Sequence, residues 1–234
     1  MIFALILIIT AVLSVALADV IRKAPVLFYV LAIAAVVVMV AGSYDLIDGL
    51  WWKALILPVR RCMVALALFC VVMFIGVLPR DSKLGMRMRS VRAELSIIAW
   101  ILCMGHMCIY LTHYLTHIPA AGLRTNVMVS FVVAILLFVL LLILGVTSFT
   151  FVKKRMRART WKRLQLLAYP FFLLTYIHLM VMLAPSALAG GSAVTTVIVY
   201  TVVFQAYLVL RLWRYAIDRK DGEDKGVPIV GSAG

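Results

Sequence analysis

Charged residues are scarce in this sequence. They make up 14% of the 234 residues, while 66% of the residues are hydrophobic, against roughly half in ordinary soluble domains. The sequence also lacks a Gly-rich phosphate-binding loop, a dinucleotide-binding fingerprint and a polar region large enough to hold a nucleotide. These absences exclude an ordinary soluble domain and a self-contained nucleotide-dependent enzyme, and they indicate an integral membrane protein.

Cysteine is also rare. The four cysteines, Cys62, Cys70, Cys103 and Cys108, all fall in apolar runs and form no CxxC pair. A disulfide framework or a zinc site is therefore not expected. We predict that these cysteines pack as small hydrophobic side chains.

Long apolar runs are what the sequence does contain. A run of ~20 apolar residues crosses a ~30 Å hydrocarbon layer as a helix. The seven runs lie near residues 2–18, 25–43, 62–79, 93–117, 126–149, 164–184 and 194–213. They predict an all-α bundle of about seven membrane spans, unbroken except for a candidate break at Pro170. The first run lacks a basic leading segment, so we expect a retained span rather than a cleaved signal peptide.

The basic residues are unevenly placed. Lys and Arg number 23 against nine Asp and Glu, and all but Lys53, Arg60, Arg61 and Arg124 fall on one side of the predicted bundle. Because Lys and Arg concentrate on the cytoplasmic side of membrane proteins, we predict a multi-pass protein of the inner (plasma) membrane with a cytoplasmic C-terminus. The positive charge then reflects topology and contact with membrane lipid, and no nucleic acid partner is expected.

The composition changes near the two ends of the chain. We expect residues 1–23 to form the N-terminal span and residues 24–215 to form the main transmembrane bundle. Residues 216–234 are polar and rich in glycine, which predicts a disordered cytoplasmic tail.

Three of the four histidines lie on one apolar span. His106, His113 and His117 are spaced by seven and four residues. On a helix with ~3.6 residues per turn they fall on one stripe. A polar side chain in hydrocarbon is costly and is normally kept only where it has a partner. The sequence therefore predicts a functional or structural partner for this stripe.

The fourth histidine, His178, lies on the sixth span at a matching depth. His178 is 15 residues from Arg163 and His106 is 14 residues from Arg92. At ~1.5 Å per residue both imidazoles should lie roughly 21–22 Å from the basic side. Two histidines at one depth on helices running the same way are suited to bind a haem iron from both sides. The alternative is that each imidazole bonds to a neighbouring hydroxyl or carbonyl group.

Two segments resemble a known family. VRAELSIIAWILCMGHMCIYL resembles the third helix of the ferric-reductase-like transmembrane family, in which a haem-ligating histidine follows a basic residue by 14 positions, here Arg92 and His106. LGVTSFTFVKKRMRARTWKRLQLLAYPFFLLTYIHL, which ends just after His178, is similar to the next loop and helix of the YedZ-type haem subunits of that family. The resemblance covers residues 60–210 and implies a six-helix haem-binding core, to which the first span is an addition.

The resemblance also implies a single b-type haem. At the two positions where family members with a further haem carry additional histidines, this sequence has Arg92 and Gln165, which are poor ligands for haem iron. These two residues are therefore candidates for the cofactor-binding region, but not for the iron. The implied axial ligands are His106 and His178, with the haem towards the extracytoplasmic side.

His113 and His117 continue the stripe outward from His106. They are candidate ligands for a metal ion or partners for haem propionates near the outer surface, or else ordinary histidines of the membrane interface. His113 is also an alternative to His106 as the axial ligand.

Other residues point to the same cofactor less directly. Trp100 and Phe171 are candidates to line a porphyrin, although simple packing explains them as well. Arg60 and Arg61, on the side with few basic residues, are candidates to pair with haem propionates or with an anionic external partner.

These features predict a membrane cytochrome b, an electron-transfer subunit of an oxidoreductase. Because the sequence has no flavin or nicotinamide domain, electrons would come from quinol or from a separate flavoprotein. They would pass to an extracytoplasmic acceptor or partner reductase. The alternative is a non-redox transporter or scaffold whose histidines line a metal or proton path.

Overall fold

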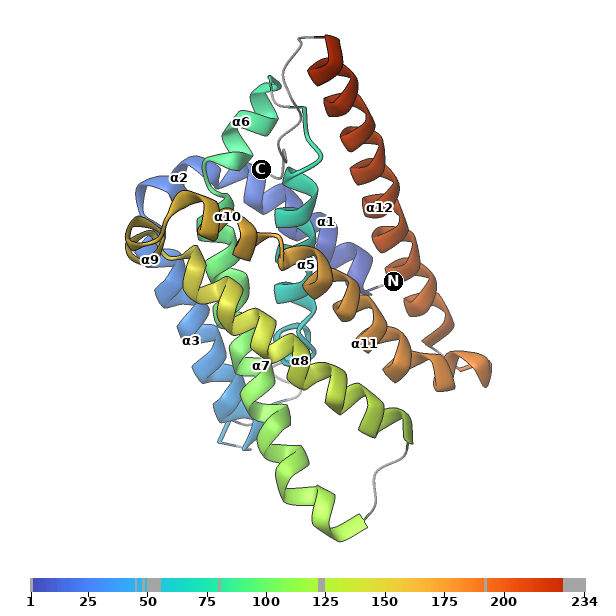
Figure 1. Cartoon of the computed structure of the whole chain (residues 1–234). Helices are drawn as coiled ribbons and strands as arrows, with labels where there is room; N and C mark the ends of the chain where they lie inside the picture. The colour runs from blue at the N-terminus through green and yellow to red at the C-terminus, as the bar shows by residue number, and fades with distance from the viewer. Residues whose placement is uncertain are drawn as a thin grey trace.

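The computed structural model describes residues 2–44, 46–47, 49, 56–79, 81–121, 125–191 and 193–224, with side chains described except at 117–121 and 221–224. Within these ranges all regular structure is helical. The seven apolar helices that match the predicted spans are α1 (Ile2–Ala16), α3 (Pro25–Ser43), α5 (Met63–Ile75), α7 (Arg92–Ala121), α8 (Thr125–Ser148), α11 (Ala168–Leu188) and α12 (Ala193–Asp224). The prediction of an all-α bundle is confirmed (Figure 1).

Five of these apolar helices are long and apolar enough to cross a membrane. They are α3, α7, α8, the segment Ala158–Leu188 that contains α11, and α12, while α1 and α5 are shorter apolar helices. Large apolar side chains on several helices are exposed, including Val30 of α3, Leu136 of α8 and Val209 of α12. Such exposure is expected where lipid rather than water surrounds the helices. The protein is a multi-pass membrane protein.

Helix α5 lies at the centre of the bundle. It is apolar on all sides, which is typical of a helix surrounded by other helices, and most of its residues are buried. It packs against α1 and α7, while α3 packs against α7 and α11 packs against both α8 and α12. The first span is therefore part of the bundle rather than an appendage, with Phe3 of α1 packing against Tyr200 of α12 at 4.5 Å between ring centroids.

A turn separates α5 from a short helical segment that precedes it. Residues 56–60 are helical, Arg61 and Cys62 form a turn, and α5 then begins at Met63. Cys62 has a left-handed backbone conformation, with φ 59°. The sequence predicted a span near 62–79, and α5 lies within that range without a break, so the turn falls at the start of the predicted span; the short helical segment at 56–60 was not predicted. Backbone groups freed inside a membrane protein need new partners.

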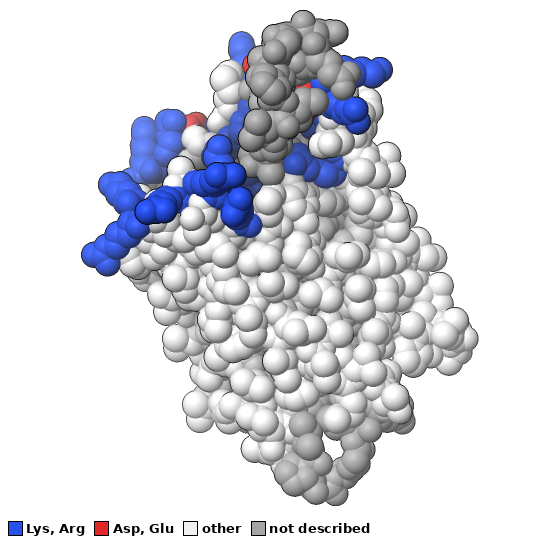
Figure 2. Space-filling view, in the orientation of Figure 1, with Lys and Arg blue, Asp and Glu red and all other residues white. Residues whose placement is uncertain are grey.

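Four short helices lie at one end of the bundle. They are α2 (Ala18–Lys23), α6 (Lys83–Arg89), α9 (Thr150–Arg155) and α10 (Ala158–Gln165). Figure 2 shows the Lys and Arg side chains gathered at this end, which we call the basic end. Asp19 of α2 pairs there with Arg87 of α6 at 2.8 Å, and Lys153 lies over the Trp161 ring at 4.3 Å. The predicted gathering of basic residues on one side is thus seen in the structure.

Helix α12 is longer than the predicted last span. It continues to Asp224, so residues 216–224 are helical, whereas the sequence predicted a disordered tail from residue 216. An ion pair one turn apart, between Arg214 and Asp218 at 3.0 Å, supports this extension. The rest of the predicted tail, 225–234, lies outside the described residues.

A close approach of α8 to α7 generates a testable prediction. A Cβ atom on Gly145 would overlap the indole ring of Trp100. We expect Gly145→Ala to destabilise the purified protein by about 1–3 kcal/mol, as overpacking does, measured as a lower Tm in detergent. In a Trp100→Leu background the same change should have little effect, because the overlapping ring is gone. Equal losses in both backgrounds would contradict this packing.

Candidate functional site

The structure brings His106 and His178 to one cavity. His106 comes from α7 and His178 from α11, and both line a cavity of about 680 Å³. This volume lies within the range of roughly 300–1,000 Å³ typical of sites for small molecules and cofactors. The two histidines that the sequence placed at matching depth therefore share one space inside the bundle.

The cavity lies towards the end of the bundle opposite the basic end. Its lining includes Ser130 near the start of α8, Ser186 near the end of α11 and Ala193 at the start of α12. The other ends of these helices lead to the basic segments of the chain. The site and the positive charge are thus separated along the bundle axis.

His106 is held by the broken helix. Its Nδ1 lies 2.8 Å from the carbonyl oxygen of Arg60, just before the turn at Arg61 and Cys62. A carbonyl oxygen only accepts hydrogen bonds, so Nδ1 must carry the proton and donate it. The turn at residues 61–62 frees this carbonyl from the helical pattern, and the imidazole satisfies it. Nε2 then keeps its lone pair and is the nitrogen available to bind a metal.

His178 is held by Ser130 of α8 in a similar way. Its Nδ1 lies 2.9 Å from Ser130 Oγ and 3.2 Å from the Ser130 carbonyl oxygen. The carbonyl contact again requires a proton on Nδ1, which leaves Nε2 unprotonated. Ser130 is a buried polar residue on an apolar helix. Histidines that bind metals commonly donate their other ring nitrogen to a carbonyl group in this manner.

The rest of the lining is mainly apolar and aromatic. Tyr110 packs against His106, with 4.5 Å between ring centroids. Arg61 brings a positive charge to the cavity from the turn before α5. The other aromatic and methionine residues of the lining are Phe3, Met63, Met107, Tyr114, Phe131, Phe138, Met182 and Tyr200. This surface suits a large, flat, mainly apolar group that carries acidic substituents.

His113 lies away from this cavity. Its side chain is exposed and packs against Tyr114, with 5.8 Å between ring centroids. It is not among the described residues that line the cavity, whereas His106 is. The side chain of His117 lies outside the described residues, so the proposed pairing of these two histidines stays a prediction.

Among the described residues, no three His, Cys, Asp or Glu side chains gather in a way that could hold a metal ion.

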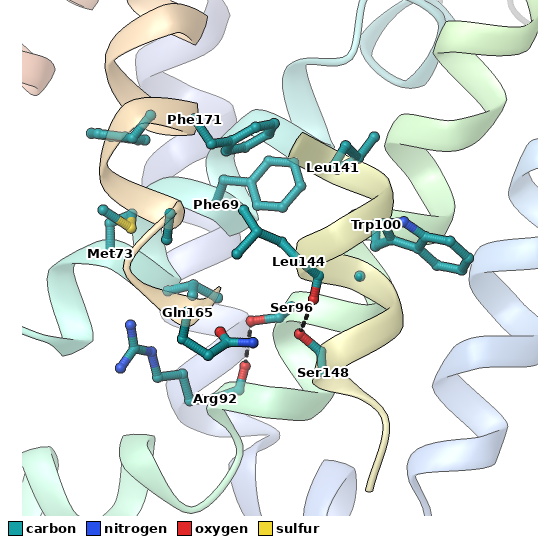
Figure 3. A pocket seen from close by; sticks show the side chains of 14 residues that line it. Phe69, Met73, Arg92, Ser96, Trp100, Leu141, Leu144, Ser148, Gln165 and Phe171 are labelled. Atoms are coloured by element: carbon teal, nitrogen blue, oxygen red, sulfur yellow. Dashed lines mark hydrogen bonds between the residues drawn. The ribbon is translucent and has the colours of Figure 1, made fainter. Parts of the chain in front are cut away.

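Arg92 and Gln165 meet at a second, smaller pocket nearer the basic end. Figure 3 shows both side chains at this pocket, together with Ser96 and Ser148. The volume is about 60 Å³, which is room for water molecules rather than a porphyrin. Gln165 also donates to Thr147 Oγ1 at 3.0 Å.

The two aromatic residues considered as porphyrin contacts also line this small pocket. Trp100 and Phe171 border it, as Arg92 does, and neither is among the described residues that line the large cavity. In the described structure their role is to pack α7 and α11 against α5 and α8. Phe171, for example, packs edge-on against Phe69 of α5 at 5.1 Å between ring centroids.

Three features of the site were missed by the sequence reasoning. The Arg60 carbonyl has no sequence signal, because its availability depends on the backbone turn at residues 61–62. Ser130 did carry a signal, since it is the one hydroxyl residue between positions 126 and 146 of a long apolar run, and polar residues are costly in a membrane. The third feature is a pair of cysteines: Cys62 Sγ lies 3.6 Å from Cys103 Sγ.

The contact between His178 and Ser130 makes a stability prediction. Ser130→Ala should lower the stability of the protein by about 1 kcal/mol, because the buried imidazole loses one of its two hydrogen-bond partners. The measurement is Tm in detergent. The control is Ser186→Ala, which removes the same hydroxyl group elsewhere in the cavity lining. Equal effects of the two changes would show that the Ser130 contact is not formed.

Comparisons with known proteins add one relative. The chain is 39% identical over 173 residues to a protein of Treponema pallidum (strain Nichols) described as an uncharacterized protein. The match covers 73% of this chain and 48% of that protein, so the chain spans about half the length of this relative. No protein-family model matches the chain. No solved structure matches it significantly.

Proposed function

We propose that the chain is a membrane cytochrome b subunit that holds one haem b between His106 and His178. The observation that carries the proposal is their shared cavity of about 680 Å³, in which each imidazole has its Nδ1 bonded to a backbone carbonyl. This arrangement directs two unprotonated Nε2 atoms to metal binding. A bound haem would supply one-electron chemistry at its iron.

The protein groups around the cavity would bind and orient such a cofactor. The Arg60 carbonyl and Ser130 fix the ring planes and tautomers of the two histidines. Arg61 offers a cation for the carboxylate groups of the cofactor edge. The apolar walls exclude water, which favours retention of the cofactor and influences its reduction potential.

The partners in this proposal are separate molecules. The resemblance to the ferric-reductase-like family favours an electron-transfer subunit of an oxidoreductase, supplied by quinol or by a flavoprotein that carries its own flavin. The acceptor would be an extracytoplasmic molecule or partner reductase, because the cavity lies opposite the basic end.

The proposed orientation places the basic end, and with it the end of α12, in the cytoplasm of a cell with the chain in its inner (plasma) membrane. The gathering of Lys and Arg at that end supports it. A C-terminal fluorescent-protein fusion should be bright and a C-terminal alkaline phosphatase fusion inactive. The reverse pattern would contradict this orientation and move the candidate site to the cytoplasmic side.

One observation favours a second function. The helix break at Arg61 and Cys62 exposes backbone next to a large cavity, as many transporters do near their substrate sites. A non-redox transporter or scaffold would use His106 and His178 to bind a metal ion or to pass protons. This alternative predicts a protein without a bound chromophore.

The proposal makes a prediction for histidine variants. The purified wild-type protein should carry about one haem per chain, and His106→Ala or His178→Ala should retain less than about a tenth of that amount. His113→Ala is the matched control on α7, and it should retain haem like the wild type. The measurement is the haem-to-protein ratio from the pyridine haemochrome spectrum.

Two outcomes of this series would overturn the proposal. Wild-type protein from cells with ample haem that contains no chromophore would favour the transporter or scaffold function. Loss of haem in His113→Ala, with retention in His106→Ala, would move the axial ligand to His113 and contradict the described cavity.

A further inference from the structure

Cys62 and Cys103 are brought together by the same helix break that holds His106. Cys62 stands at the turn before α5, and Cys103 lies on α7, 41 residues further along the chain. Their sulfur atoms are 3.6 Å apart, and both cysteines are free thiols. A disulfide bond is about 2.05 Å long, so the two sulfur atoms need to approach by about 1.5 Å to form one.

We propose that Cys62 and Cys103 are an oxidisable thiol pair that forms an intramolecular disulfide when a peroxide enters the bundle. Cys62 is half-buried and Cys103 is buried. Arg61 and Met63, the residues on both sides of Cys62, line the large cavity. Cys108 also lines this cavity, so a small neutral oxidant that enters it reaches both Cys108 and the chain segment of Cys62.

The chemistry balances with peroxide as the only oxidant. The Cys62 thiol gives up its proton as its sulfur attacks one peroxide oxygen, the O–O bond breaks, and the leaving hydroxide takes that proton, so the products are a sulfenic acid and one water. The sulfur of Cys103 then attacks the Cys62 sulfur, the S–O bond breaks, and the leaving hydroxide takes the Cys103 proton to form a second water. Overall, two thiols lose two electrons and two protons, and one peroxide becomes two waters.

The backbone at Cys62 favours the approach of its sulfur atom to that of Cys103. Its φ of 59° is an uncommon conformation for a residue other than glycine, and the turn separates two helical segments. Small rotations in the turn can move Cys62 while α5 and α7 remain in place. Cys103, in contrast, is fixed within the long helix α7.

The disulfide would join the two segments that the His106 hydrogen bond already joins. Cys62 is two residues after Arg60, and Cys103 is three residues before His106 on the same face of α7. Oxidation would thus fix the Arg60 carbonyl beside His106 by a covalent link. The thiol chemistry does not depend on the proposed haem. Its test measures only the oxidation state of the cysteines.

The test is peroxide treatment of the full-length protein in detergent. After quenching, the protein is denatured, alkylated, digested without reduction and examined by mass spectrometry. We expect a peptide pair linked through Cys62 and Cys103, with a matching loss of alkylated Cys62 and Cys103. The exposed Cys108 serves as an internal control for the dose, since it should be oxidised under the same conditions.

Two variants sharpen the result. Cys108→Ser should form the Cys62–Cys103 link to the same extent as the wild type. Cys103→Ser should leave a sulfenic acid at Cys62 that dimedone traps, because the second thiol is absent. The proposal is overturned if Cys108 is oxidised while Cys62 and Cys103 stay fully alkylated, or if Cys62 links to another cysteine. Both of these readouts come from wild-type protein and do not require that the variants fold.

Discussion

The hydrogen bond between His106 Nδ1 and the Arg60 carbonyl is the contact on which the site depends. In a bundle surrounded by lipid, a backbone carbonyl released from its helix has no water to bind and must find a donor within the protein. The imidazole of His106 is that donor. The same bond fixes the tautomer of His106, allows the turn at Arg61 and Cys62, and brings Arg61 to the cavity.

The helix break therefore links three properties that look unrelated in the sequence. It provides the carbonyl group that accepts the hydrogen bond of His106, places the positively charged Arg61 at a mainly apolar cavity, and brings Cys62 next to Cys103. Its cost is the left-handed backbone at Cys62, which persists only because surrounding contacts compensate for it. On the other side of the cavity, Ser130 gives His178 a comparable pair of contacts without any break in α8.

Much of the fold could be predicted from the sequence, because apolar runs of sufficient length have one stable form in a membrane. The seven apolar helices and the gathering of basic residues at one end were predicted in this way. The helical segment at 56–60, and with it the break before α5, was not predicted, because the apolar run was read as starting at Cys62. The helical residues 216–224 were missed because their polar composition resembles a tail, while the pair Arg214 and Asp218 supports a helix.

The candidate site could be predicted in part. Counting residues from the basic side placed His106 and His178 at one depth, and both line one cavity. The hydrogen-bond partners of their Nδ1 atoms could not be predicted from the sequence. Every residue has a backbone carbonyl, so nothing in the sequence marks that of Arg60, and Ser130 lies on a helix that contains no histidine. The different positions of His106 and His113 also depended on the packing of α7 against α5 and α8, which a stripe of histidines on one helix does not reveal.

The measurement that tests the central claim most directly is near-infrared magnetic circular dichroism of the oxidised, purified protein. It reports the identity of the two axial ligands of a low-spin haem. The account predicts the signature of two imidazole ligands, from His106 and His178. The signature of one histidine and one methionine would contradict it, since Met107 and Met182 also line the cavity, and a protein without haem would contradict it outright.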